Sequence, residues 1–128
     1  MSFVYKPPTE WIAPDVFPTE LLCQAKEIAI DLETRDPHLK ELGPGYIRGD
    51  GEAVGISFAI DGYENYFPFA HESGFNFSKK KVLEFTRKIC ATESDKVFHN
   101  STYDVGWLTH HGVPINGRII DTMIVAPL

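Results

Sequence analysis

Two carboxylates, Asp31 and Glu33, lie at the end of a nearly continuous apolar run in the sequence. That run, residues 27–32, predicts a buried strand. Because side chains alternate along a strand, Asp31 and Glu33 would share one face of it. Neighbouring carboxylates repel each other unless a proton or a cation lies between them, and Mg²⁺ and Mn²⁺ prefer such oxygen ligands. The alternative is that both acids are solvated at a strand end, or that Glu33 caps the following loop.

A second polar group lies where a strand expected over 96–99 meets a helix expected over 101–111. Asp104 falls in the first turn of that helix, and Asn100 precedes it by one turn. One interpretation is that Asp104 turns inward as a third carboxylate, with Asn100 as a neutral hydrogen-bond donor. The other is a capping box, in which Ser101 begins the helix and Asp104 needs no metal. His99 either lines the same site or has only a structural role, packed against neighbouring residues.

Residues 35–51, directly after the first two acids, show neither a helical nor a strand period and include four glycines. The pattern predicts a long loop, and long loops in compact domains are often functional. Tyr46 could stack on an unpaired base and Arg48 could meet a phosphate, as in single-strand binding proteins. The alternative is an ordered loop whose aromatic residues pack on the protein itself.

The remaining pattern predicts the elements that position these residues. Residues 1–26 read as a proline-rich arm and a short helical turn capped by Thr19, and residues 27–128 as the domain. Asp61-Gly62 predicts a hairpin, and Ser78 is expected to cap a helix. Strands are expected over 27–32, 53–60, 63–70, 96–99 and 118–120. Three strands in meander order followed by helix–strand–helix–strand predict an α/β domain with a mixed sheet of about five strands, flanked by helices.

Composition limits the class of protein. The chain has 128 residues, 43% of them hydrophobic and 23% charged, which is typical of a globular domain. The net charge of −6 argues against a protein that grips nucleic acid by bulk charge, so metal ions or a local patch would have to do so. No apolar stretch is long enough for a membrane span and the start lacks a signal-peptide core, so a cytoplasmic location is expected.

Five segments occur in an order and spacing that match one family: residues 28–34, 54–60, 66–71, 100–104 and 121–123. Residues 28–34 and 100–104 resemble the first and second exonuclease motifs of a known domain. Residues 54–60 and 66–71 resemble its second and third strands, and residues 121–123 resemble the start of its next helix. That domain is the 3′–5′ proofreading exonuclease of family A (DNA polymerase I-like) DNA polymerases, including those of phages. The resemblance extends from about Glu27 to Leu128.

The resemblance implies a ribonuclease H-like fold and a DEDD-type 3′–5′ exonuclease. In that family four acids hold two divalent metals, Mg²⁺ or Mn²⁺, which drive an in-line displacement. Three of these acids would be Asp31, Glu33 and Asp104, each serving as a metal ligand and as a catalytic residue. The substrate would be a single-stranded or frayed DNA 3′ end. Residues expected to contact it are Thr34, His99, Asn100, Tyr103 and, from the loop, Tyr46 and Arg48.

The family's third motif lies downstream of residues 121–123, and the sequence ends at Leu128 before that region. Asp121 is expected to cap the last helix rather than to replace the missing acid. The sequence therefore predicts the front part of an exonuclease domain, with weak metal binding and low or no nuclease activity. Its expected partners are a polymerase domain, the rest of the exonuclease, or a second copy through the uncovered face. The alternatives are a ribonuclease D-like enzyme acting on RNA and a non-catalytic remnant of the fold.

Overall fold

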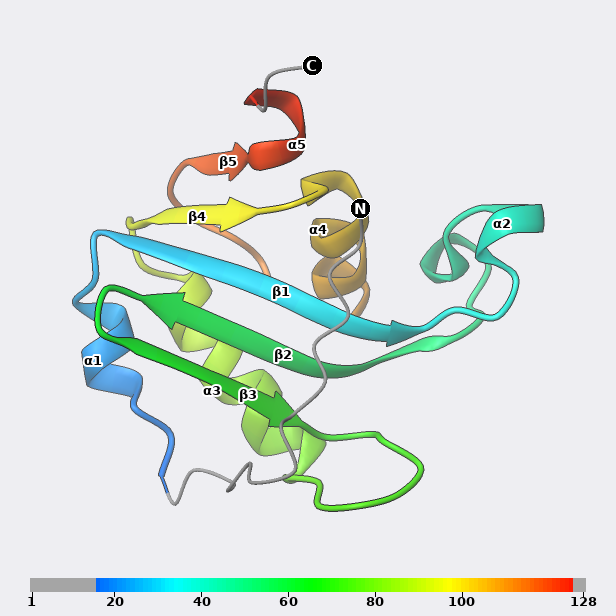
Figure 1. Ribbon diagram of the computed structural model, residues 1–128, viewed down its shortest axis with the longest axis horizontal. Helices are drawn as coiled ribbons and strands as arrows, with labels where there is room; N and C mark the ends of the chain where they lie inside the picture. The colour runs from blue at the N-terminus through cyan, green and yellow to red at the C-terminus, as the bar shows by residue number, and fades with distance from the viewer. Residues whose placement is uncertain (1–15, 126–128) are drawn as a thin grey trace.

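A five-stranded mixed sheet in the order β3-β2-β1-β4-β5 forms the centre of the molecule (Figure 1). The computed structural model describes residues 16–125. The strands are β1 (Glu27–Arg35), β2 (Glu52–Ile60), β3 (Tyr63–Pro68), β4 (Asp95–Phe98) and β5 (Ile119–Asp121). β2 is antiparallel to both β1 and β3, whereas β4 is parallel to β1 and to β5. The predicted α/β arrangement with a mixed sheet is confirmed.

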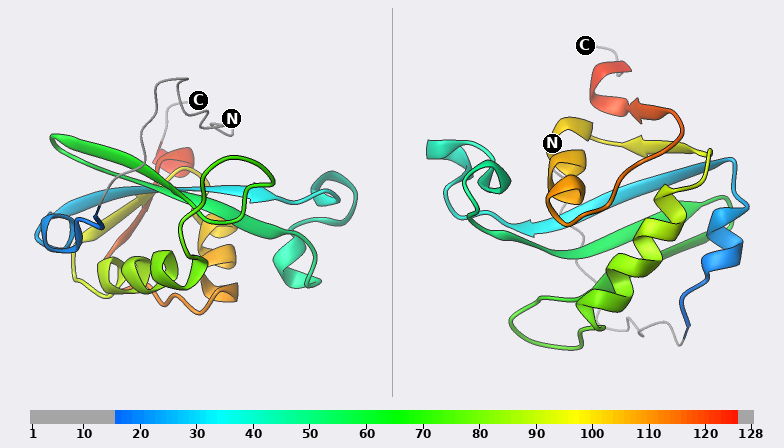
Figure 2. Two further views of the ribbon diagram at one scale, coloured as in Figure 1. Left: turned by 90° about the horizontal axis from the view of Figure 1, so that it is seen from below. Right: turned by 180° about the vertical axis from the view of Figure 1, so that it is seen from behind.

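The longer helices cover one face of this sheet. The helices are α1 (Thr19–Cys23), α2 (Leu39–Leu42), α3 (Lys79–Cys90), α4 (Ser101–His110) and α5 (Thr122–Val125), with a 3₁₀ turn η1 (Gly45–Ile47). Figure 2 shows α3 and α4 on the same side of the sheet, and α1 packs against α3. No helix of the described residues 16–125 is long and apolar enough to cross a membrane.

The alternation of β1 decides which of its side chains meet the helices. Ile28, Ile30 and Leu32 are buried in the core cluster. Asp31 and Glu33 alternate with them and are partly exposed. Both acids therefore lie on the face of the sheet that α3 and α4 leave free, as the alternation predicts.

Two helix starts differ from the sequence prediction. α1 begins at Thr19 itself without a capping side chain, so Thr19 is not a cap. α4 begins at Ser101, and the residue before it, Asn100, adopts a φ of 84°. Ser101 is thus the first helical residue, and the capping box with Asp104 does not form. The predicted cap of α3 is confirmed, since the Ser78 hydroxyl accepts a hydrogen bond from a backbone N–H of the first turn.

The segment after β1 is more ordered than the predicted loop. β1 continues to Arg35, and α2 and η1 follow within residues 36–51. Asp36 anchors the segment, because its Oδ2 accepts hydrogen bonds from the Gly45 N–H at 3.0 Å and from the Tyr103 hydroxyl at 2.9 Å. These bonds connect the segment to α4, the helix that carries Asp104.

Tyr46 provides a second anchor by packing its ring over Gly106 of α4. A Cβ added at Gly106 would lie 2.1 Å from Cζ of Tyr46. We expect Gly106→Ala to lower the free energy of unfolding by about 1–3 kcal/mol, although alanine is the better helix former. Urea unfolding measures this change, with Thr109→Ala, an exposed substitution on the same helix, as the control. A Gly106→Ala variant as stable as wild type would contradict the close packing.

Some predictions concern residues outside the described part of the chain. The proline-rich arm falls on residues 1–15, and the apolar chain end falls partly on residues 126–128. Within the described part, Phe17 packs among the rings of Phe67, Phe77 and Phe85. Met123 is 51% exposed.

Candidate functional site

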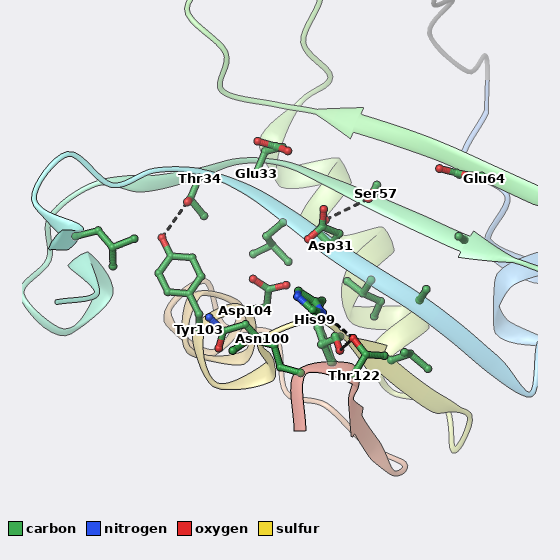
Figure 3. A pocket seen from close by; sticks show the side chains of 18 residues that line it. Asp31, Glu33, Thr34, Ser57, Glu64, His99, Asn100, Tyr103, Asp104 and Thr122 are labelled. Carbon is green, nitrogen blue, oxygen red and sulfur yellow. Dashed lines mark hydrogen bonds between the residues drawn. The ribbon is translucent and has the colours of Figure 1, made fainter. Parts of the chain in front are cut away.

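A pocket of about 630 Å³ opens at the carboxyl end of β1, between β2, β4 and the first turns of α4 and α5. Figure 3 shows the side chains that line it. Seven of the predicted site residues are among them, contributed by two separate segments of the chain, residues 31–34 and 99–104. They are Asp31, Glu33, Thr34, His99, Asn100, Tyr103 and Asp104.

Asp104 is the most deeply buried acid of this pocket. Its side chain belongs to the first turn of α4, and the residue is only 5% exposed. Its Oδ2 has no hydrogen-bond partner. Burial and, next, the negative charge of Asp31 raise the pKa of Asp104 to about 8, against the opposing effect of a hydrogen bond from the Leu32 backbone. Asp104 thus offers a buried oxygen with no donor, in a place where its negative charge is costly.

Asp31 faces the same space from β1. Figure 3 shows the side chains of Asp31, Asp104 and His99 gathered in one region of the pocket. Burial raises the pKa of Asp31, and the nearby His99 works in the opposite direction. Two partly desolvated carboxylates in one pocket do not both ionise cheaply. A proton or a cation between Asp31 and Asp104 relieves this cost.

Glu33 lies two residues further along the same face of β1 and lines the pocket, but Figure 3 shows its carboxylate apart from that of Asp104. Among residues 16–125, no three side chains of His, Cys, Asp or Glu are grouped so that they could hold a metal ion. The structure thus brings Asp31 and Asp104 together and leaves Glu33 outside a ready-made ligand cluster.

His99 has a defined orientation at the pocket rim. Its Nδ1 lies 2.8 Å from Oγ1 of Thr122, and that hydroxyl donates to the Phe98 carbonyl at 3.2 Å. Because the hydroxyl proton is already used, Nδ1 of a neutral His99 must carry the proton and donate it. Its Nε2 is then left as a hydrogen-bond acceptor.

The side chains of Thr34 and Tyr103 are hydrogen-bonded to each other. Their hydroxyl oxygens lie 2.9 Å apart, and the Tyr103 hydroxyl donates to Asp36 at 2.9 Å. Thr34 is therefore the donor to Tyr103. Burial raises the pKa of Tyr103, so its hydroxyl stays neutral. This chain of hydrogen bonds fixes the pocket wall between the end of β1 and α4.

The two predicted residues of the loop do not reach the pocket. Tyr46 forms an edge-on contact with Trp107, with ring centroids 5.6 Å apart. Arg48 donates to Asp50 at 3.1 Å and to the Gly43 carbonyl at 2.7 Å. Tyr46 therefore packs on α4, and Arg48 is bonded within its own segment.

Several pocket residues were missed from the sequence. Ser57 lies opposite Asp31 in the β1–β2 register, and its hydroxyl donates to the Asp31 carbonyl at 3.4 Å. The predicted hairpin fixes only the register of β2 with β3, so no local pattern in the sequence pairs Ser57 with Asp31. The others contribute a mostly apolar wall whose members come together only in three dimensions. They include Ala29, Leu39, Ala59, Val97 and Met123.

The sequence of this chain is similar to that of a known protein. No protein-family model matches the sequence. Over 108 residues the chain is 41% identical to the DNA-directed DNA polymerase of Pseudomonas phage M6. This chain is homologous to part of a phage DNA polymerase. The match covers 82% of this chain, which we call the polymerase-related chain, and 16% of the phage polymerase. The polymerase resemblance drawn from the sequence is thereby confirmed.

The fold of the polymerase-related chain also resembles that of a solved structure described as the apo form of a nuclease. The TM-score is 0.54 and the sequence identity 20%, and the match covers 84% of this chain and 45% of that one. At this identity the likeness concerns the fold. Together with the sheet order, it confirms the predicted ribonuclease H-like fold.

Proposed function

We propose that this polymerase-related chain carries three acids of a metal-dependent 3′–5′ exonuclease that shortens DNA at single-stranded or frayed 3′ ends. One observation carries the proposal. The buried Oδ2 of Asp104 has no hydrogen-bond partner and lies in a pocket that Asp31 also lines. A polymerase relative and a nuclease-like fold support the same class of activity.

The residues of the pocket fit a hard divalent cation. Carboxylate oxygens are the ligands that Mg²⁺ and Mn²⁺ prefer, and Asp104 supplies one that has no other partner. Asp31 would be the second ligand and Glu33 the third. When bound, such ions generate the attacking hydroxide and stabilise the leaving 3′ oxygen of a phosphodiester.

The other pocket residues would receive the end of the strand. Asn100 lines the pocket one turn before Asp104, and its side chain would hold the substrate near the scissile phosphate. Glu33 lies on the same face and would also contact the terminal 3′ hydroxyl. The apolar wall around Leu39 and Met123 suits the flat face of a nucleoside.

The partners are part of the same proposal. The chain spans 16% of the phage polymerase that it matches, so a polymerase domain and the remainder of an exonuclease are the proposed partners. We also expect the chain to self-associate through the exposed apolar end near Met123. Light scattering over a range of concentrations measures this association.

A second candidate function is a non-catalytic module of the same fold. The observation that favours it is the absence, among residues 16–125, of three acids grouped around one point. Such a module would bind DNA without hydrolysing it. The two functions therefore differ in product formation.

We expect the chain to shorten a 5′-labelled single-stranded DNA from its 3′ end only slowly in Mn²⁺. The sequence contains counterparts of three of the family's four acids, and the two-metal mechanism needs a complete set. Glu33→Ala should remove this activity, whereas Glu27→Ala, an exposed acid on the same strand, should leave it unchanged. Electrophoresis of the products gives both rate and polarity.

The outcomes separate the alternatives. Degradation that survives chelation or Glu33→Ala would contradict the proposed function. Mn²⁺-dependent binding of the DNA without any product would favour the non-catalytic module. An RNA strand of the same sequence, degraded faster than the DNA, would favour a ribonuclease D-like enzyme.

A further inference from the structure

Asp121, at the end of β5, accepts four hydrogen bonds through its carboxylate. Oδ1 accepts from the backbone N–H of Asn100 at 3.1 Å and from that of Met123 at 2.9 Å. Oδ2 accepts from the Ser101 N–H at 2.8 Å and from the Ser101 hydroxyl at 2.7 Å. Asp121 thus satisfies N–H groups at the starts of two helices, α4 and α5.

The charged form of Asp121 is strongly favoured by these bonds. Desolvation alone would raise its pKa, but the hydrogen bonds from Ser101, Asn100 and Met123 outweigh it and lower the pKa to about 2. A carboxylate has about four lone-pair sites, and here the protein already uses four. Asp121 therefore has little capacity left to coordinate a metal.

The backbone that Asp121 holds is strained. Asn100 is the only residue other than glycine with a positive φ among residues 16–125, at 84°. Residues with side chains rarely adopt this conformation, although asparagine does so more readily than most, and such positions concentrate at functional sites. The Asn100 carbonyl in turn accepts from the Asp104 N–H at 3.3 Å. The strained residue thus sets the position of the turn that carries Asp104.

We infer that Asp121 is a positioning residue of the candidate site, which holds Asn100 in its left-handed conformation and so keeps Asn100 and Asp104 at the pocket. It does so without being a metal ligand. Its effect on metal binding rests on the proposed function, whereas its effect on the backbone does not. Thr122, the next residue, fixes His99 on the same rim, so β5 and α5 together frame the pocket.

The first readout is local and needs no metal. Amide hydrogen exchange of Asn100 and Ser101, followed by NMR in EDTA, should be at least tenfold faster in Asp121→Ala than in wild type. Asp121→Asn, which keeps Oδ1 as an acceptor, should have an intermediate effect and provides a second variant if alanine impairs folding. Ser101→Ala, which loses one hydroxyl bond and keeps the Asp121 carboxylate, is the matched control. Unchanged exchange at Asn100 and Ser101 in both Asp121 variants would overturn the inference.

The second readout is Mn²⁺ affinity, which should fall at least tenfold in Asp121→Ala. A glycine at position 100 adopts a positive φ without a steric penalty. The double variant Asp121→Ala with Asn100→Gly should therefore recover several-fold of the lost affinity. If Asp121 were a metal ligand instead, glycine would recover none, and the inference would be wrong. If wild type binds no Mn²⁺, the proposed function fails, and the amide exchange alone decides the positioning role.

Discussion

Asp104→Asn is expected to be more stable than wild type at pH 8 in EDTA, by about 2–4 kcal/mol in the free energy of unfolding. Burial and the charge of Asp31 raise the pKa of Asp104 from 3.8 to about 8 in the folded chain. Between these two values the unfolded chain loses the proton while the folded chain keeps it. Wild-type stability therefore falls as the pH rises from about 4 to 8. Asparagine has the same shape and no charge to bury.

Urea unfolding at a series of pH values from 5 to 8 measures this difference. The two proteins should be closest in stability at pH 5 and diverge as the pH rises. Asp61→Asn is the matched control, because Asp61 is exposed in the β2–β3 turn and Asn-Gly suits such a turn equally well. Parallel pH profiles for wild type and Asp104→Asn would show that Asp104 is not the buried acid described here.

Mn²⁺ affinity is expected to rise steeply with pH, by roughly tenfold per unit between pH 6 and 8. A metal ligand must be deprotonated, and Asp104 holds its proton until a pH of about 8. Asp104→Asn should bind Mn²⁺ weakly at every pH and lose this dependence. Electron paramagnetic resonance of free Mn²⁺ gives the affinity at each pH. A flat profile in wild type would place the ion elsewhere.

Much of the fold could be predicted because it depends on local patterns. The apolar run around Ile28 and Ile30 defined β1, and the alternation of side chains along a strand defined its two faces. Asp61-Gly62 defined the hairpin, and the structure gives Gly62 a φ of 83°, a conformation that glycine adopts without a steric penalty. Ser78 marked the start of α3 for an equally local reason, a hydroxyl that accepts from the first turn.

The features that could not be predicted depend on residues distant in the sequence. The start of α4 is fixed by Asp121, which no pattern around Ser101 reveals. The order of residues 36–51 depends on Tyr46 meeting a glycine on α4. A local sequence pattern shows neither that Gly106 is the partner of Tyr46 nor that the missing side chain leaves space for the Tyr46 ring.

The candidate site was only partly accessible from the sequence. Alternation placed Asp31 and Glu33 on one face, but only the family resemblance connected them with Asp104. The burial of Asp104 and its unpartnered oxygen emerge from the packing of α4 beside β1. These features separate Asp104 from an ordinary capping residue, which would be exposed and hydrogen-bonded.

Calorimetric titration with Mn²⁺ at pH 8 tests the central claim most directly, since that claim is a divalent cation held between Asp31 and Asp104. Wild type and the Asp61→Asn control should give the same binding heat. Asp31→Ala and Asp104→Asn should each reduce the affinity by at least tenfold. Equal heats and affinities in wild type and Asp31→Ala would contradict the claim.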